Sequence, residues 1–144
     1  QIEELDKISV TIENTIVARQ IVLTNIRIIP DKAFEDHVLL LHLVVPKAQK
    51  FGIKSCYGCK SLNKVIAPDV SEIESYAFKD CKMLPFINLS NCKKLGMESF
   101  YGCICLKNVV CNQVEEIPLN CFANCYCLEF AIFNSLETIK FGVF

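Results

Sequence analysis

Residues 59–78 read CKSLNKVIAPDVSEIESYAF, and the spacing of their apolar side chains decides the fold. Leu62, Val65 and Ala67 follow the pattern LxxLxL, so inward side chains alternate with outward ones over the last four residues of the pattern. Such alternation predicts a short strand that is buried on one side. The Pro-Asp pair that follows ends the strand, because proline cannot donate a hydrogen bond to a sheet.

The second half of the same stretch predicts a return of the chain across the core. Val70 and Ile73 point back inward across a turn, and residues 75–78 form a tight helical turn or an irregular segment on the opposite side. A unit of this size is too short to bury its own apolar side chains. It must therefore stack on copies of itself, with the strands forming one parallel sheet.

Copies of this unit follow one another at a step of 22 residues from residue 18 to residue 144, without insertion or deletion. Six positions of the unit are apolar in every copy, and one of them holds Phe34, Cys56, Phe78, Phe100, Phe122 and Phe144. Another position holds only turn formers: Asp36, Gly58, Asp80, Gly102 and Asn124. The pattern predicts a mostly β repeat solenoid that turns a corner at fixed intervals.

The two ends of the chain differ from the repeats. Residues 1–17 do not fit the repeat, and their own alternation predicts a hairpin or an off-register strand that caps the first of about six repeats in residues 18–144. The last residue, Phe144, occupies a core position with no following repeat to cover it. We expect either a longer array that continues beyond this end or an end-to-end contact between two copies.

Two segments, AFKDCKMLPFINL (77–89) and CFANCYCLEFAIF (121–133), resemble the motif AFxxCxxLxxIxLP. This motif is the hallmark of the BspA-like (Treponema pallidum-type) leucine-rich repeat family, and the resemblance extends over residues 18–144. The chain departs from the family pattern at several places. Its period is one residue shorter, Cys56 replaces the usual Phe, and His37 replaces the usual Cys.

The resemblance implies a leucine-rich-repeat horseshoe arc. Its short-stranded parallel sheet lies on the concave face, and turns or short 3-10 or helical segments lie on the convex side. Family members are typically cell-surface proteins of bacteria and parasitic protists that act in adhesion and host contact, although intracellular members occur. A cell-surface or extracellular location is therefore favoured by the resemblance, with a cytoplasmic location as the alternative.

Composition and charge argue against several classes of function. The net charge is −1 without a run of like charges, which gives no electrostatic footprint for nucleic acid. The longest apolar run, residues 38–45, is far too short to insert into and span a membrane. The two histidines, His37 and His42, have no serine or acidic partner beside them, and no glycine-rich phosphate loop is present. We therefore expect neither catalysis nor a cofactor or metal.

Ten cysteines are many for a chain of this length, but the repeat explains most of them. One corner column holds His37, Cys59, Cys81, Cys103 and Cys125, where a thiol serves as a small apolar side chain and weak donor. Cys56, Cys92 and Cys111 occupy core positions. A disulfide between adjacent repeats, with Cys105 and Cys127 as the leading pair, is the next interpretation. A zinc site at the two CxC pairs and a redox CxxC at residues 56–59 are less favoured.

The outward side of the predicted sheet is the expected binding surface. Its central column holds Val22, Val44, Ile66, Asn88, Val110 and Ile132, and the adjacent column holds Gln20, His42, Lys64, Phe86, Asn108 and Phe130. A contiguous apolar patch on a sheet marks a partner site, with Phe86 and Phe130 as anchors. The alternative is that β-branched residues simply favour a pleated surface. A glycan at the sequon Asn88-Leu89-Ser90 would obstruct the patch.

These observations favour a non-enzymatic protein-recognition module that binds a partner protein through the sheet, in adhesion or host contact at a cell surface. An intracellular leucine-rich-repeat scaffold or regulatory subunit that uses the same surface is the alternative. A spacer array without any partner is the third hypothesis.

Overall fold

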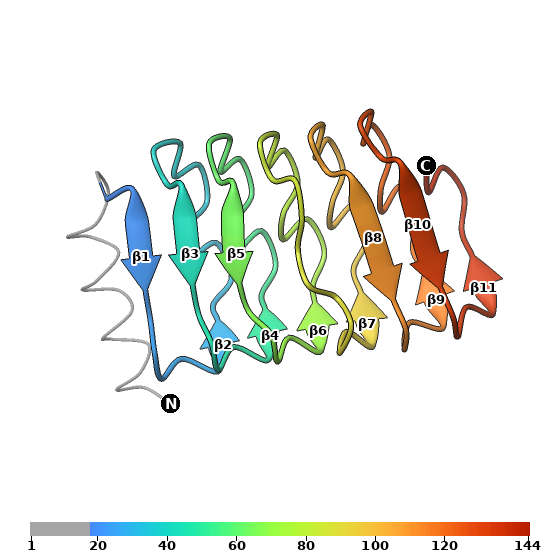
Figure 1. Cartoon of the computed structure of the whole chain (residues 1–144), viewed down its shortest axis with the longest axis horizontal. Helices are drawn as coiled ribbons and strands as arrows, with labels where there is room; N and C mark the ends of the chain where they lie inside the picture. The colour runs from blue at the N-terminus through green and yellow to red at the C-terminus, as the bar shows by residue number, and fades with distance from the viewer. Residues whose placement is uncertain (1–17) are drawn as a thin grey trace.

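A computed structural model gives the structure of residues 18–144, which form a stack of short parallel strands without a helix in this range (Figure 1). The predicted N-terminal cap, residues 1–17, lies outside the described residues. Paired strands lie 22 residues apart in the sequence, as in Gln20 with His42 and His42 with Lys64. The predicted parallel solenoid with a 22-residue period is therefore confirmed.

The repeats contribute short strands to two ladders. The ladder nearer the viewer in Figure 1 contains β1 (Gln20–Val22), β3 (His42–Val44), β5 (Lys64–Ile66), β8 (Asn108–Cys111) and β10 (Phe130–Phe133). The ladder behind it contains β2 (Ile28–Ile29), β4 (Lys50–Phe51), β6 (Glu72–Ile73), β7 (Lys94–Leu95), β9 (Glu116–Ile117) and β11 (Thr138–Ile139). We call the outward sides of these ladders the front face and the back face; the front face includes residues 86–88.

The back ladder was not predicted. Its strands are two residues long, and in β2, β4, β6, β7 and β9 only the second residue is buried, as Ile73 is in β6. A two-residue strand shows no alternation, so its pattern is the same as that of a turn that places one side chain in the core. The remaining side of each repeat is made of turns, in agreement with the expectation for the convex side.

The core lies between the two ladders and the turns. The repeat positions that are apolar in every copy are buried along most of the solenoid, and the aromatic rings at one of them form a stack. The ring centroids of Phe78 and Phe100 are 5.4 Å apart, and those of Phe100 and Phe122 are 5.5 Å apart. In the last repeat the equivalent residues Ile139 and Phe144 are 55% and 62% exposed.

The corners require backbone in the left-handed region at two positions of each repeat. One of these is the predicted column of turn formers, where Asp36, Gly58, Asp80, Gly102 and Asn124 all have φ between 57° and 71°. At Gly102 (φ 71°) a Cβ atom would also overlap Oδ1 of Asp80. Glycine is suited to this position for two reasons: it adopts a positive φ without strain, and it has no Cβ to collide with the neighbouring repeat.

The cysteine column is buried at the same corner, as the repeat predicts. The thiols of Cys59, Cys81, Cys103 and Cys125 each donate to a backbone carbonyl of the preceding repeat, with Sγ···O distances of 3.0, 3.1, 3.1 and 3.2 Å. All ten cysteines are free thiols, and only Cys105 and Cys127 are not buried. The column therefore holds neighbouring repeats together by hydrogen bonds.

Two prolines coincide with the interruptions of the two ladders. Residues 86–88 form no strand, so the front ladder divides into β1-β3-β5 and β8-β10, and the back ladder divides between β7 and β9. Pro85 and Pro118 stand where other repeats use a backbone N–H to bond the preceding repeat, such as Asn63 N to Leu41 O and Gly96 N to Ile73 O. Because proline has no N–H, each ladder loses a bond at that point.

Candidate protein-binding face

All eleven side chains predicted to form the binding surface lie on the front face. Five strands carry in-register pairs from both predicted columns, for example His42 with Lys64 and Val44 with Ile66. The set comprises Val22, His42, Val44, Lys64, Ile66, Phe86, Asn88, Asn108, Val110, Phe130 and Ile132, each exposed or half-buried. The register of the sheet therefore brings together residues that are spread over 110 positions of sequence, between 22 and 132.

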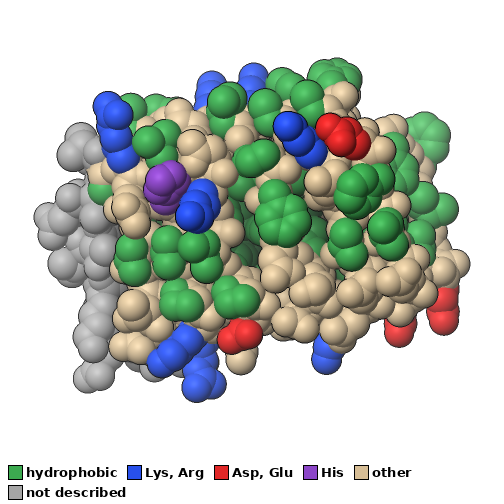
Figure 2. Space-filling view, in the orientation of Figure 1, with side chains coloured by type: hydrophobic (Ala, Val, Ile, Leu, Met, Phe, Trp, Pro, Cys, Tyr) green, Lys and Arg blue, Asp and Glu red, His purple; other side chains and the backbone are tan. Residues whose placement is uncertain are grey.

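Large apolar side chains on the front face are exposed to solvent (Figure 2). Phe86 is 53% exposed, Phe130 is 46% exposed, and Val22, Ile66 and Ile132 are 38–50% exposed. Charged side chains in Figure 2 are few and lie mostly toward the edges of this face. A surface of this composition can bury apolar area against another protein.

Asn108 occupies the position between the two phenylalanines in its column, opposite Phe130 in the register of β8 and β10. Its Oδ1 atom is buried and has no hydrogen-bond partner. A buried polar atom without a partner is costly and gains a hydrogen bond when a donor is supplied from outside. The sequence placed Asn108 in the column, but it did not predict that the amide oxygen is buried.

A groove of about 370 Å³ opens on the front face where the ladder is interrupted. One wall consists of residues 63–68, in and beside β5, and the other consists of Pro85, Phe86 and Asn88. Its floor includes the buried side chain of Val65, and Ile66 lies at its rim. Sequence reasoning missed this groove, although a proline at the start of a predicted strand is a signal for an interruption.

The sequence profile of a family described as "BspA type Leucine rich repeat region" matches residues 27–144 in 6 copies. The chain belongs to this family. The resemblance inferred from the AFxxCxxL motifs is thus confirmed, and the front face is that of a BspA-type leucine-rich repeat. No curated protein matches the chain.

Three solved structures share the BspA-type fold of this chain. The leucine-rich repeat protein of T. pallidum is 22% identical with a TM-score of 0.70, over 88% of this chain and 75% of that one. A leucine-rich cell surface protein of Faecalibacterium prausnitzii A2-165 is 23% identical with a TM-score of 0.80, over 84% and 37%. A leucine-rich repeat protein of Bacteroides ovatus is 17% identical with a TM-score of 0.55, over 85% and 45%. This chain thus spans less than half of the latter two chains.

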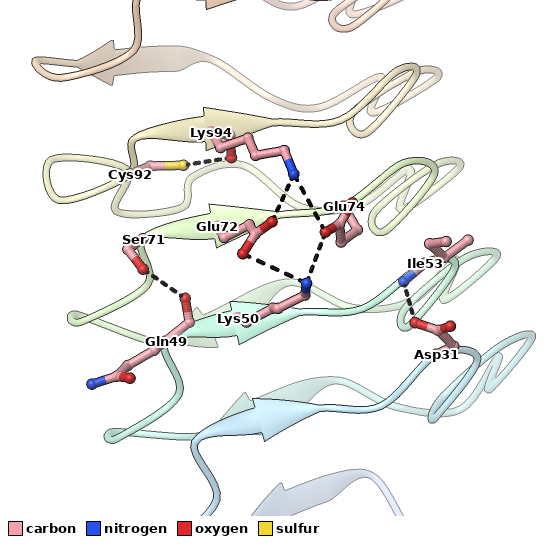
Figure 3. A network of polar contacts seen from close by, with 9 residues as sticks. All are labelled: Asp31, Gln49, Lys50, Ile53, Ser71, Glu72, Glu74, Cys92 and Lys94. Carbon is pink, nitrogen blue, oxygen red and sulfur yellow. Dashed lines mark hydrogen bonds and ion pairs between the residues drawn. The ribbon is translucent and has the colours of Figure 1, made fainter.

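The back face of this BspA-type solenoid carries a ladder of charged side chains (Figure 3). Lys50 Nζ lies 2.8 Å from Glu74 and 3.5 Å from Glu72, and Lys94 Nζ lies 2.8 Å from Glu72. Lys50, Glu72 and Lys94 lie on the adjacent strands β4, β6 and β7, and Glu74 follows β6, so opposite charges alternate from repeat to repeat. The hydrogen bond from Lys94, with the charge of Lys50 nearby, lowers the pKa of Glu72 to about 2.

We expect Glu72→Gln to remove an acid-dependent part of the stability. Because folding lowers the pKa of Glu72 from 4.5 to about 2, its contribution is complete above pH 4.5 and is lost as the pH falls toward 2. Its side chain is 29% exposed, so we expect only about 1 kcal/mol at pH 7. Urea unfolding at pH 7 and pH 3 measures this: the difference between wild type and variant should shrink at pH 3. Glu116→Gln, whose carboxylate is 3.6 Å from Lys140 and more exposed, serves as the control.

The buried thiols of the BspA-type corner are unsuited to redox or nucleophilic chemistry. Burial raises the pKa of Cys56 and Cys103 well above the usual range, and it raises the pKa of Cys125 to about 12. A thiolate is the reactive species, so a raised pKa makes these groups inert.

Over residues 18–144, no cluster of three or more His, Cys, Asp or Glu side chains is placed to hold a metal ion. The same residues contain no helix that is long and apolar enough to cross a membrane.

Proposed function

We propose that the protein is a non-enzymatic recognition module that binds a partner protein through its front face, in adhesion or contact with a host or partner at a cell surface. The observation that carries the proposal is the asymmetry of the two faces. The front face exposes two phenylalanines and three β-branched side chains, whereas the back face holds a ladder of paired charges. Leucine-rich repeats are a protein-interaction scaffold, and aromatic side chains dominate the binding energy of interfaces.

The proposed location at a cell surface is supported by the fold shared with the F. prausnitzii cell surface protein. The sequon bears on the same proposal. Oδ1 of Asn88 accepts hydrogen bonds from the backbone N and the hydroxyl of Ser90, at 3.0 and 2.7 Å, which holds this side chain in a local turn on the front face. A glycan on Asn88 would cover the apolar surface, so the proposal requires Asn88 to remain unmodified.

The proposal predicts that Phe86→Glu and Phe130→Glu each abolish capture of the partner protein. A carboxylate placed at a buried anchor costs about 2 kcal/mol or more, which is roughly a 30-fold loss of affinity. The immobilised protein is incubated with surface extracts and, separately, with cytosolic extracts, and the captured proteins are quantified by mass spectrometry. Cytosolic proteins that depend on both phenylalanines would favour the intracellular scaffold.

The matched control is Ile28→Glu, which places the same charge at an apolar side chain that is 51% exposed on the back face. It should retain capture. Circular dichroism of all three variants must equal that of the wild type. Capture that survives both phenylalanine changes, or that is lost equally in Ile28→Glu, would show that the front face is not the site.

A further inference from the structure

The interruption of the front ladder leaves backbone groups without partners on one side of β5. In the intact parts of the ladder, Leu41 O accepts hydrogen bonds from Asn63 N and Lys64 N, and Val45 N donates to Ile66 O. The equivalent groups one repeat later are Asn63 O and Ala67 N. Within residues 18–144 neither of them makes a backbone hydrogen bond, since Pro85 has no N–H and residues 86–88 do not pair with β5.

These two unpaired groups belong to residues that line the groove of about 370 Å³. Most of the lining is apolar, with Val65, Ile66 and Phe86 among the side chains. A groove that offers apolar walls together with free backbone donors and acceptors fits an extended polypeptide segment. Such a segment supplies a side chain for the walls and main-chain groups for the unpaired N–H and C=O.

The charged residues that line the groove indicate which side chains the bound segment should carry. Lys64 is the one charged residue among those that line the groove, and no carboxylate lines it. No ion pair of Lys64 is present in the described part of the chain, in contrast to Lys50 and Lys94 on the back face. An unpaired ammonium at the rim of an apolar groove favours a carboxylate on the bound molecule.

We propose that the groove between β5 and residues 85–88 is the anchoring subsite of the front face. It takes an extended segment of the partner protein in which a large apolar residue stands beside an aspartate or glutamate. The apolar side chain enters between Ile66 and Phe86, and the carboxylate pairs with Lys64. This inference rests on the proposed function, because it names the chemistry that the front face recognises.

The probe is a set of capped nine-residue peptides of serine and threonine with a central Asp-Phe, Asn-Phe, Lys-Phe or Asp-Ala pair. Binding to the ¹⁵N-labelled protein is followed by NMR titration. We expect the Asp-Phe peptide to shift the amides of Val65, Ala67 and Phe86, and to bind about tenfold more tightly than each of the other three. Equal binding of all four peptides, or binding of none, would overturn the proposal.

Two variants test the position of the subsite. Ile66→Glu places a carboxylate in the apolar wall and should weaken binding of the Asp-Phe peptide at least tenfold, whereas Ile28→Glu, at an exposed apolar side chain of the back face, should not. Pro85→Lys restores an N–H that can bond Asn63 O, as Lys107 N bonds Pro85 O at 3.0 Å. This variant should close the groove and weaken binding of the Asp-Phe peptide as much as the change at Ile66 does. Pro118→Lys, the same change on the back ladder, should leave peptide binding unchanged.

The outcomes separate the subsite from the proposed function. Loss of peptide binding in Ile66→Glu but not in Ile28→Glu supports the subsite. Amide shifts confined to β8 and β10 would contradict the subsite while leaving the front face as the binding surface. Shifts confined to the back ladder would contradict both. If hydrogen exchange shows that the new amide of Pro85→Lys is protected and the peptide still binds at full affinity, the groove is not where it binds.

Discussion

Replacing Phe100 with alanine should lower the free energy of unfolding by about 3–5 kcal/mol, the range for removing a fully buried phenylalanine. The side chain is 0% exposed, and its ring stacks between those of Phe78 and Phe122 at 5.4 and 5.5 Å. The cavity would lie in the middle of the stack, where repeats on both sides depend on the ring. Urea unfolding monitored by circular dichroism measures the loss.

Phe144→Ala is the matched control for Phe100. It removes the same ring at the same repeat position, but Phe144 is 62% exposed and stacks on one side only, 6.1 Å from Phe122. We expect a loss below about 1 kcal/mol, since little apolar area is returned to water. Comparable losses in the two variants would mean that the stack does not contribute through burial.

Gly96→Ala should cost about 2–4 kcal/mol of unfolding free energy, because the added methyl has no room. A Cβ at this position would overlap the backbone N of Ser75 and the carbonyl carbon of Glu74, and it would lie 2.6 Å from Cα of Ser75. These atoms belong to the backbone of the preceding repeat and cannot turn aside as a flexible side chain would. Thermal and urea unfolding of the purified variant measure the loss.

The control for Gly96 is Lys140→Ala, at the same position two repeats later. This residue already has a Cβ, and its ion pair with Glu116 is long and exposed, so a change within about 0.5 kcal/mol is expected. A wild-type stability in Gly96→Ala would show that the repeats can shift apart there without cost.

The sequence predicted the front ladder and the core because each of them depends on one residue type recurring at one position of the repeat. Leu62, Val65 and Ala67 show this directly, and all three are buried. The back ladder was not predicted because strands such as Glu72–Ile73 are too short to show an alternation of apolar and polar side chains. Its charge pairing was nevertheless present in the sequence, since Lys50, Glu72 and Lys94 stand at successive 22-residue steps.

The groove could not be predicted at the same level, although Pro85 is visible in the sequence. A missing N–H predicts a lost bond, but it does not say whether the neighbouring backbone closes the gap or leaves it open. That outcome depends on how the chain around Pro85 packs, which the repeat pattern does not encode.

The positions of Pro85 and Pro118 also bear on how force would pass along the molecule. Between the fourth and fifth repeats, neither residues 86–88 with β8 nor β7 with β9 are joined by strand pairing. The backbone links that remain there lie at the turns, including Phe100 N to Cys121 O and Gly102 N to Ala123 O, with Lys107 N to Pro85 O at the edge of the front ladder. We therefore expect tension along the solenoid axis to separate the repeats first at this junction, where no strand pairing adds to the turn bonds and the ring stack.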